Sequence, residues 1–378
     1  MSIYRRRGSG HFQVLIDIEP TASGGRRRKA VGCFRTRKEA ERAERQALEA
    51  RDRGIDLSPK TVTVSEAVAR YTERCVTKHL AVKTIERYEE LARCHIAPLI
   101  GSVPLARLKP AHVGSVYAEA KRKGLSAKSV RHVHSFLHAV LDWAVEQSLC
   151  VRNVADISRR DLPGAQLSPA QALPEDEVRR LLDAAMGTPW HALFTLAVCT
   201  GARRAELCAL RWSDVDFDRG TMTIARSIVR TKGGLLVKGT KTGRLRTVPL
   251  NGLAISALRA QRARQNEKRL HKGERYENQD FVFASAVGKP WNPDSVSNAF
   301  RKLARDLKLS TRRLHDVRHS AATWLLQSGI DVRTVAAVLG HSSPVTTLNT
   351  YAHVLPGAEA RAVEAIAERL ARVENGAS

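Results

Sequence analysis

The sequence lacks the features that mark membrane proteins and metal- or nucleotide-dependent enzymes. It has no long uncharged apolar run and no lipidation signal. Its first residues, MSIYRRRGSGHF, lack the apolar core of a signal peptide, so we expect a cytoplasmic location. It also has no Walker motif and no cluster of acidic metal ligands. We therefore expect no metal ion and no other cofactor.

Paired cysteines are also missing. The six cysteines are scattered along the chain without any C-x-x-C motif, and most stand in apolar helical contexts. This pattern favours reduced core thiols over metal or redox sites.

Acidic residues are scarce relative to basic ones. The chain has 63 Lys and Arg against 38 Asp and Glu, a net charge of +25. This excess is more than solubility requires and predicts a polyanionic partner, with nucleic acid favoured over a membrane surface. At 378 residues with 43% hydrophobic residues, the chain can form two or three globular domains.

Residues 1–57 are predicted to form a small sheet closed by a helix. Apolar residues alternate with polar ones from Phe12 to Ile18, and RRRKAVGCF predicts a returning strand. Thr36 and Glu39 have the spacing of a capping box that opens a helix to about Ala50. Two basic clusters flank the sheet, and we expect them to contact DNA rather than only solvent: Arg5, Arg6 and Arg7, then Arg26, Arg27 and Arg28.

Residues 62–155 are predicted to be all helical. Ser65 is the expected cap of the first helix, and Ser126 is expected to open the longest one. Lys128 and Arg131 lie near the start of that long helix, where phosphates bind favourably. We therefore expect this region to bind DNA.

Residues 172–378 are predicted to form a mixed domain after a linker from Val151 to Gln171. A helix begins at Pro174, and an apolar helix from His191 to Cys199 ends at Gly201. Strands follow: DRGT is a hairpin turn, TMTIARSIV is one strand, and LLVKGTKTGRLRTVPL is a further pair around the turn that holds Lys241.

Six residues in this last region could act on a phosphate: Arg203 in TGARRAEL, Lys241, His315 and Arg318 in LHDVRH, and His341 and Tyr351 in LGHSSPVTTLNTY. His315 and Arg318 are three residues apart on one helix face, so both can reach one ligand. Each residue alone also has an ordinary interpretation. Arg203 could pair with Glu206, the lysine could be solvated, and the tyrosine could belong to the core.

Together these six residues resemble, in order and approximate spacing, the tyrosine recombinases, and in particular the phage-type integrases of that family. The resemblance covers essentially the whole chain. It implies a multidomain α+β fold made of an arm-site DNA-binding domain, an all-α core-binding domain, and a mainly α catalytic domain with a small antiparallel sheet. Asn153-Val154, where relatives often have Asn-Pro, and Ala205, where they often have Gly, depart from the pattern.

The resemblance also implies a role for each residue. Arg203 and Arg318 would clamp a phosphate, because each presents a planar fork of donors. Tyr351 would attack phosphorus and form a 3′-phosphotyrosyl link, with His315 as the candidate base. Lys241 would protonate the leaving 5′-oxygen. His341 would hydrogen-bond the phosphate, and Glu206 would brace its neighbours.

The implied function is site-specific integration and excision of a phage genome or another mobile element. The implied assembly is a homotetramer on double-stranded DNA with core- and arm-type sites, in the bacterial nucleoid. An excisionase and a DNA-bending host factor are candidate partners. We expect the helix from Ala358 to about Val373 to dock on a neighbouring protomer. A resolvase, a type IB topoisomerase and a catalytically inactive architectural protein are the alternatives.

Overall fold

The computed structural model describes residues 3–5, 10–18, 27–52, 62–164, 172–239, 245–311, 313–351 and 364. The chain divides into two compact units, Met1–Leu167 and Ser168–Ser378, which are described separately below. In the described part of the chain, no helix is both long and apolar enough to cross a membrane. All six cysteines are described and are free, and Cys33 is exposed rather than in the core.

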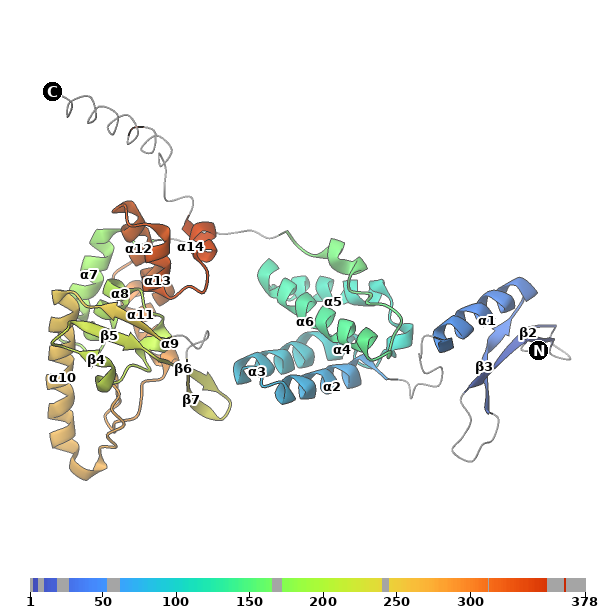
Figure 1. The fold of residues 1–378 in the computed structure, drawn as a ribbon, viewed down its shortest axis with the longest axis horizontal. Coiled ribbons are helices and arrows are strands. Elements are labelled where there is room, and N and C mark those ends of the chain that lie inside the picture. Colours follow the sequence, from blue (N-terminus) through green and yellow to red (C-terminus); the bar gives the residue numbers. More distant parts are fainter. Residues whose placement is uncertain are drawn as a thin grey trace, which may run out of the picture. The chain divides into compact units, whose positions relative to one another are not determined.

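The N-terminal residues form an antiparallel sheet in the order β1-β2-β3, covered by one helix (Figure 1). Its elements are β1 Ile3–Arg5, β2 Phe12–Ile18, β3 Arg27–Phe34 and α1 Arg37–Asp52. Val14 and Ile16 of β2 are buried with Ala40 and Ala47 of α1, as the alternation predicted. The predicted capping box is present, since Glu39 N donates to Thr36 Oγ1 at 3.2 Å and Thr36 N donates to Glu39 Oε2 at 3.1 Å.

The second group of elements is all helical. It comprises α2 Val64–Thr77, α3 Val82–Leu91, a π-helical turn Ala92–Ile96, α4 Ala97–Ile100, a 3₁₀ turn Leu105–Arg107, α5 Pro110–Arg122, α6 Ala127–Glu146 and a 3₁₀ helix Ile157–Asp161. Its core includes Leu91, Val116 and the apolar face of α6. Ser126 caps α6 as predicted. The predicted cap at Ser65 is wrong, because the N-cap is Thr63, two residues earlier, which forms a reciprocal capping box with Glu66.

The segment after α6 packs on these helices, although the sequence predicted a linker from Val151 onward. Val154 and Ala155 belong to the helical core. Ser158 is buried, and its hydroxyl donates to the Pro110 carbonyl at 3.0 Å. Because the segment is mostly polar, its few buried apolar residues did not predict packing on the helices.

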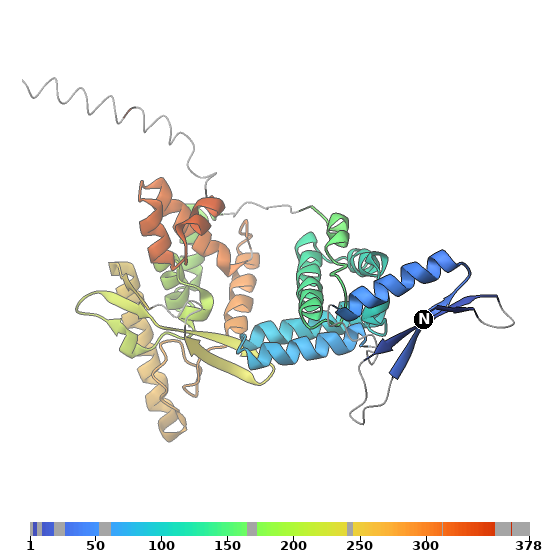
Figure 2. The same ribbon diagram turned by 45° about the vertical axis from the view of Figure 1, so that its right-hand side comes forward.

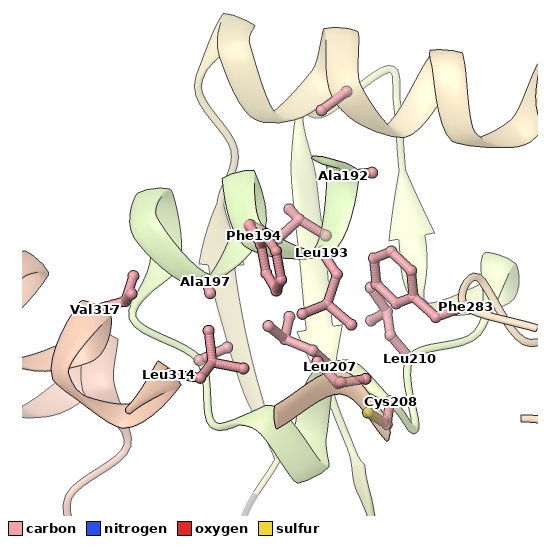
Figure 3. Packing of buried hydrophobic residues seen from close by; sticks show 14 of the residues in the cluster. Ala192, Leu193, Phe194, Ala197, Leu207, Cys208, Leu210, Phe283, Leu314 and Val317 are labelled. Carbon is pink, nitrogen blue, oxygen red and sulfur yellow. The ribbon is translucent and has the colours of Figure 1, made fainter. Parts of the chain in front are cut away.

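The second unit begins with helices around an apolar core. Its first elements are α7 Glu175–Ala185, α8 His191–Thr200 and α9 Arg204–Leu207, followed by a 3₁₀ turn Trp212–Asp214. Figure 3 shows Leu193 and Phe194 of α8 among Leu207, Leu210 and Phe283. The predicted apolar helix at His191 is confirmed. Pro174 is the N-cap of α7 rather than its first residue.

Two small antiparallel sheets follow, in the orders β4-β5-β8 and β6-β7. The strands are β4 Val215–Asp216, β5 Thr221–Ile224, β6 Arg226–Thr231, β7 Gly234–Gly239 and β8 Arg246–Pro249. The strands on either side of Lys241 do not pair with each other, which corrects the prediction. Val248 of β8 is buried beside Met222 of β5, whereas Leu235 of β7 is exposed. The partner of β7 is β6, and these two strands form a hairpin (Figure 2). TMTIARSIV is likewise two strands and not one.

The remaining helices complete the second unit and carry the end of the described chain. They are α10 Gly252–Lys272, a 3₁₀ turn Gly273–Arg275, α11 Pro293–Asp306, α12 Leu314–Gln327, α13 Val332–Leu339 and α14 Pro344–Tyr351. At 21 residues, α10 is one residue longer than α6, which is the longest helix of residues 62–155, as predicted. Leu314 and Val317 bring α12 against α8 near Ala197 (Figure 3), and α13 and α14 lie beside α12 (Figure 1).

Candidate active site

Arg318 is a buried cation with an unused donor. It projects from the second turn of α12 and is 4% exposed. Its Nη1 donates to the Gly201 carbonyl at 2.5 Å, while its Nη2 has no hydrogen-bond partner among the described residues. Leaving a buried charged donor unpaired is costly. An anionic ligand would satisfy it.

Arg203 is held from two sides at the start of α9. Its Nη1 donates to Glu206 Oε1 at 2.8 Å, and its Nη2 donates to the Gly340 carbonyl at 3.0 Å. The backbone N–H of Arg203 also donates to Glu206 Oε2, at 2.9 Å. The ion pair with Glu206, considered from sequence as an alternative to catalysis, is present. It fixes the guanidinium in place and is compatible with a catalytic role.

Arg318 and Arg203, the two arginines of the predicted phosphate clamp, each donate a hydrogen bond to the carbonyl of a glycine that ends a helix. Gly201 ends α8 with φ +58°, and Gly340 ends α13 with φ +70°. This left-handed conformation is readily available to glycine. The space around each glycine is also full. A Cβ would lie 2.5 Å from Leu339 Cδ2 at Gly201, and 2.5 Å from Arg246 Nη1 at Gly340.

Arg246 is a third guanidinium in the site, and the sequence prediction missed it. It begins β8 and makes two hydrogen bonds to Glu206, Nη2 to Oε2 at 2.6 Å and Nη1 to Oε1 at 3.2 Å. Its Nε donates to the Val338 carbonyl at 3.3 Å. Arg246 therefore ties β8 to α9 and to the end of α13. Residues two apart in a strand face the same side, and Val248 and Leu250 are buried. This spacing was a signal in the sequence that the Arg246 side chain faces inward.

The site has an excess of positive charge. Arg203 and Arg246 both pair with one carboxylate, Glu206, which is 5% exposed, and Arg318 is a third guanidinium nearby. Burial raises the pKa of Glu206, but its bonds to Arg246 and then Arg203 outweigh this and hold the pKa below its ordinary value. Burial, and then repulsion by Arg203, lowers the pKa of Arg318 to about 9, so this group is still a cation at neutral pH. The arrangement suits a phosphate.

Two of the predicted histidines lie beside this charge. Burial, and then the neighbouring His319 and Arg318, lowers the pKa of His315 to about 4. Burial, and then Arg318 and Arg203, lowers that of His341 to about 4. Both imidazoles are therefore neutral at pH 7. The Nδ1 of His341 lies 2.7 Å from the Thr347 hydroxyl, which orients the ring.

Tyr351 ends α14 and is 2% exposed. Its ring packs with Ala322, Leu326, Val335 and Leu339 of α12 and α13. Burial raises the pKa of Tyr351 to about 12. Its hydroxyl lies 2.6 Å from Nδ1 of His319, a residue that the sequence prediction missed. His319 is four residues after His315, so the helical spacing placed both on one face.

A cavity of about 390 Å³ adjoins Arg318 and His315. It is lined by further arginines from three places in the chain, namely Arg204, Arg301 and Arg313. Arg204 bonds Ser297, Arg301 donates to Asn298 Oδ1 at 2.8 Å, and Arg313 donates to Asp316 Oδ2 at 2.9 Å. The site thus continues into a basic hollow that suits an extended polyanion. Among the described residues, no three His, Cys, Asp or Glu side chains gather as metal ligands.

Several predicted residues lie elsewhere or outside the described residues. Lys241 and the segment after Tyr351, including the expected docking helix except for Glu364, lie outside them, as do Arg6, Arg7 and Arg26. Arg27 is described only as part of β3. Arg5 is exposed at the end of β1. The Nε of Arg28 donates to Asp17 Oδ1 at 3.1 Å. Lys128 is exposed, whereas Arg131 donates to the Pro163 carbonyl at 3.1 Å.

Comparison with curated proteins identifies relatives over most of the chain. It is 30% identical over 342 residues to an integrase of Streptomyces ambofaciens, covering 86% of this chain and 85% of the relative. It is 27% identical over 383 residues to a XerC-like tyrosine recombinase of Caldanaerobacter subterraneus subsp. tengcongensis, covering 96% and 97%.

Solved structures share the fold. The Tn1549 transposon integrase in complex with transposon right end DNA matches with a TM-score of 0.70 and 22% identity, covering 81% of this chain and 99% of that one. A lambda integrase tetramer bound to a Holliday junction matches with a TM-score of 0.59 and 20% identity, covering 91% and 96%. These two likenesses support the multidomain α+β fold predicted from sequence.

Family models match both units. The phage integrase family model matches residues 171–357, which include the whole candidate site. The model for the phage integrase N-terminal SAM-like domain matches residues 63–119. With the 30% identity to the Streptomyces integrase, these matches show that the chain belongs to the phage integrase family and is a site-specific tyrosine recombinase.

Proposed function

We propose that this recombinase integrates and excises a mobile element by cleaving DNA with Tyr351 at a phosphate held by Arg203 and Arg318. The observation that carries the proposal is the buried Nη2 of Arg318, which has no partner among the described residues, in a site where Arg203 and Arg246 pair with Glu206. An attack on phosphorus builds negative charge on the non-bridging oxygens. Cations that are already fixed in place stabilise that charge at no reorganisation cost.

The cleavage step transfers the phosphoryl group from DNA to the enzyme. The Tyr351 oxygen forms a bond to phosphorus while the bond from phosphorus to the 5′-oxygen breaks, leaving a 3′-phosphotyrosyl link and a 5′-hydroxyl. Lys241 is the proposed donor of the proton to the leaving oxygen, and His341 a proposed donor to the phosphate. Rejoining reverses this step, and the retained bond energy makes ATP unnecessary.

The proposal extends to the assembly and the division of the chain. Residues 1–57 would bind arm-type DNA, residues 62–155 core-type DNA, and residues 172–378 would carry the chemistry. Two duplexes with two cleavage sites each require four protomers, as in the lambda integrase tetramer on a Holliday junction. We further propose a nucleoid location and partnership with an excisionase and a DNA-bending host factor.

Strand exchange tests this function. Two duplexes that carry the element's attachment sites, each with a different end label, are incubated with the protein, and recombinant strands that carry both labels are expected. Religation of each strand only to its own partner would instead support a topoisomerase.

Arg318→Ala should retain DNA binding at moderate salt yet lose cleavage by about 10²- to 10³-fold, as when an oxyanion-stabilising donor is removed. Full cleavage by this variant would remove Arg318 from the clamp.

The second candidate function is resolution of DNA dimers. The XerC-like relative favours it, because it matches 96% of this chain. The N-terminal sheet and its basic strands favour integration, since a simple resolvase needs no second DNA-binding unit. Sequencing the DNA beside the gene separates the two. Direct repeats that flank the gene are expected for an integrated element, and their absence in the genome would favour the resolvase.

A further inference from the structure

The hydrogen bond between Tyr351 and His319 places an imidazole on the nucleophile itself. The Tyr351 hydroxyl lies 2.6 Å from His319 Nδ1, and the two ring centroids are 5.7 Å apart. His319 follows the clamp residue Arg318 directly on α12, so one helix turn carries both groups. The geometry of a general base is hydrogen-bond contact with the proton that it removes.

Both partners of this hydrogen bond are neutral at pH 7. Burial keeps the pKa of Tyr351 near 12, so the phenol retains its proton at neutral pH. Burial is also the main cause that lowers the pKa of His319, so its ring is neutral. A neutral imidazole accepts at one nitrogen and carries a proton on the other. When the ring proton is on Nε2, the phenol donates to Nδ1, and this is the tautomer that a proton acceptor requires.

His315, the base implied by family resemblance, is placed differently. It stands edge-on to His319 with ring centroids 4.9 Å apart, and no hydrogen bond joins it to Tyr351 among the described residues. It lines the cavity beside Arg318 instead. Its position suits contact with the phosphate rather than with the phenol.

We propose that His319 is a catalytic residue that accepts the Tyr351 proton during cleavage and returns it during rejoining. As the phenol oxygen bonds to phosphorus, its proton passes to His319 Nδ1 and the ring becomes an imidazolium. On rejoining, the bond from phosphorus to the tyrosine breaks and Nδ1 gives the proton back. This role rests on the proposed function of Tyr351 as nucleophile.

The test measures single-turnover formation of the covalent protein–DNA complex by the full chain. His319→Leu removes the acceptor, and His319→Asn keeps an acceptor near the position of Nδ1 that is not a base. Both variants should form the complex about 10²- to 10³-fold more slowly, within the range for loss of a general base, while binding DNA as the wild type does.

The chain offers a matched control in its first unit. There the Nδ1 of the buried His134 lies 2.7 Å from the Tyr117 hydroxyl, so the same pair of groups occurs away from the site. His134→Asn should lose stability through the same broken contact but cleave at the wild-type rate. Equal loss of cleavage in His134→Asn and His319→Asn would show a general structural effect and overturn the inference.

A second measurement separates proton transfer from positioning. Replacing Tyr351 by 3,5-difluorotyrosine lowers the pKa of the nucleophile, so a base is needed less. The rate ratio between wild type and His319→Asn should then shrink by at least about tenfold, as Brønsted behaviour predicts. An unchanged ratio would overturn the role of proton acceptor. The difluorotyrosine measurement uses His319→Asn, so it still tests the inference if His319→Leu does not fold.

The outcomes distinguish this inference from the function on which it rests. Wild-type protein that forms no covalent complex, or Tyr351→Phe that still forms one, would defeat the proposed function. A normal wild type, an inactive Tyr351→Phe and a fully active His319→Leu would leave that function standing and defeat the role of His319 alone.

Discussion

At the scale of single residues, the site depends on side chains that hold other side chains. Arg318 and Arg203 are the proposed phosphate donors, and neither is placed by its own helix alone. Carbonyls of Gly201 and Gly340 and the carboxylate of Glu206 fix their guanidiniums. Rotamers held in this way lose little entropy on binding, which is how a site becomes preorganised.

Arg246→Gln tests this dependence. The variant removes two hydrogen bonds from Glu206 and should cost about 3 kcal/mol of stability, as for a broken buried pair. Cleavage should fall about 10²-fold because Arg203 and the end of α13 shift. Arg226→Gln is the control, since Arg226 Nη1 bonds both oxygens of Asp214 in the same unit at 2.9 and 2.8 Å. It should lose stability but not cleavage, measured by urea unfolding and covalent-complex formation. Equal cleavage by the two variants would contradict the positioning role.

The histidines predict how stability depends on pH. The pKa values of His315 and His341 are about 4 in the folded protein, below the ordinary value near 6.5. Between these values the unfolded chain binds more protons, so the free energy of unfolding should fall as pH is lowered from about 6.5 towards 4. His341→Asn should lose less stability than wild type between pH 7 and pH 5 in urea unfolding. His271→Asn, at an exposed position on α10, should behave as wild type. Identical pH dependence in wild type and His341→Asn would contradict the lowered pKa of His341.

At the scale of elements, helix ends carry the site. Gly201 ends α8, Gly340 ends α13, and the short helix α9 begins directly after Arg203. Helix ends leave backbone carbonyls without partners inside the helix. Here two of these carbonyls accept hydrogen bonds from Arg318 and Arg203, so the ends of two helices position the two arginines of the proposed clamp.

Gly340→Ala tests this coupling. Alanine in the left-handed region costs about 1 kcal/mol, and its Cβ would also meet Arg246 Nη1 at 2.5 Å. Gly329→Ala is a matched control with φ +81° and nothing within 4 Å of a Cβ. Both variants should lose stability in thermal unfolding, but only Gly340→Ala should also lose cleavage. Full cleavage by Gly340→Ala would show that this helix end does not position the clamp.

The sequence predicted these elements where a local rule decides them. Alternation predicted β2, capping patterns predicted the starts of α1 and α6, and Gly201 predicted the end of α8. Sequence patterns failed to predict features that depend on tertiary contacts. Strand pairing around Lys241 depends on which strand has a buried face, and no local pattern distinguishes β8 pairing with β5 from β8 pairing with β7.

The same limit explains the site. Arg203, Glu206, His315, Arg318, His341 and Tyr351 were predicted because they resemble a family pattern in order and spacing. Arg246 and His319 matter through contacts with residues at 206 and 351, and sequence distance does not encode such contacts. A dense cluster in the last quarter of the chain is only part of the site, since α9 and β8 supply the rest.

At the scale of the whole molecule, the net charge of +25 concerns DNA binding, and the placement of Tyr351 concerns the commitment to cleave. A strongly basic chain binds DNA without regard to sequence, so the commitment to cleave must come from the site. Tyr351 is 2% exposed and keeps its proton, so we expect it to be a poor nucleophile until a phosphate reaches it. If Tyr351 is the nucleophile, as proposed, its burial keeps it from reacting with other electrophiles.

Mapping the covalent link by mass spectrometry tests the central claim most directly. The full chain is trapped on an attachment-site duplex that carries a nick beside the cleavage position, digested with protease and nuclease, and sequenced. We predict one modified peptide, with the nucleotide 3′-phosphate on Tyr351, and no covalent complex with Tyr351→Phe. A phosphate on any other residue, or a complex formed by Tyr351→Phe, would contradict the account.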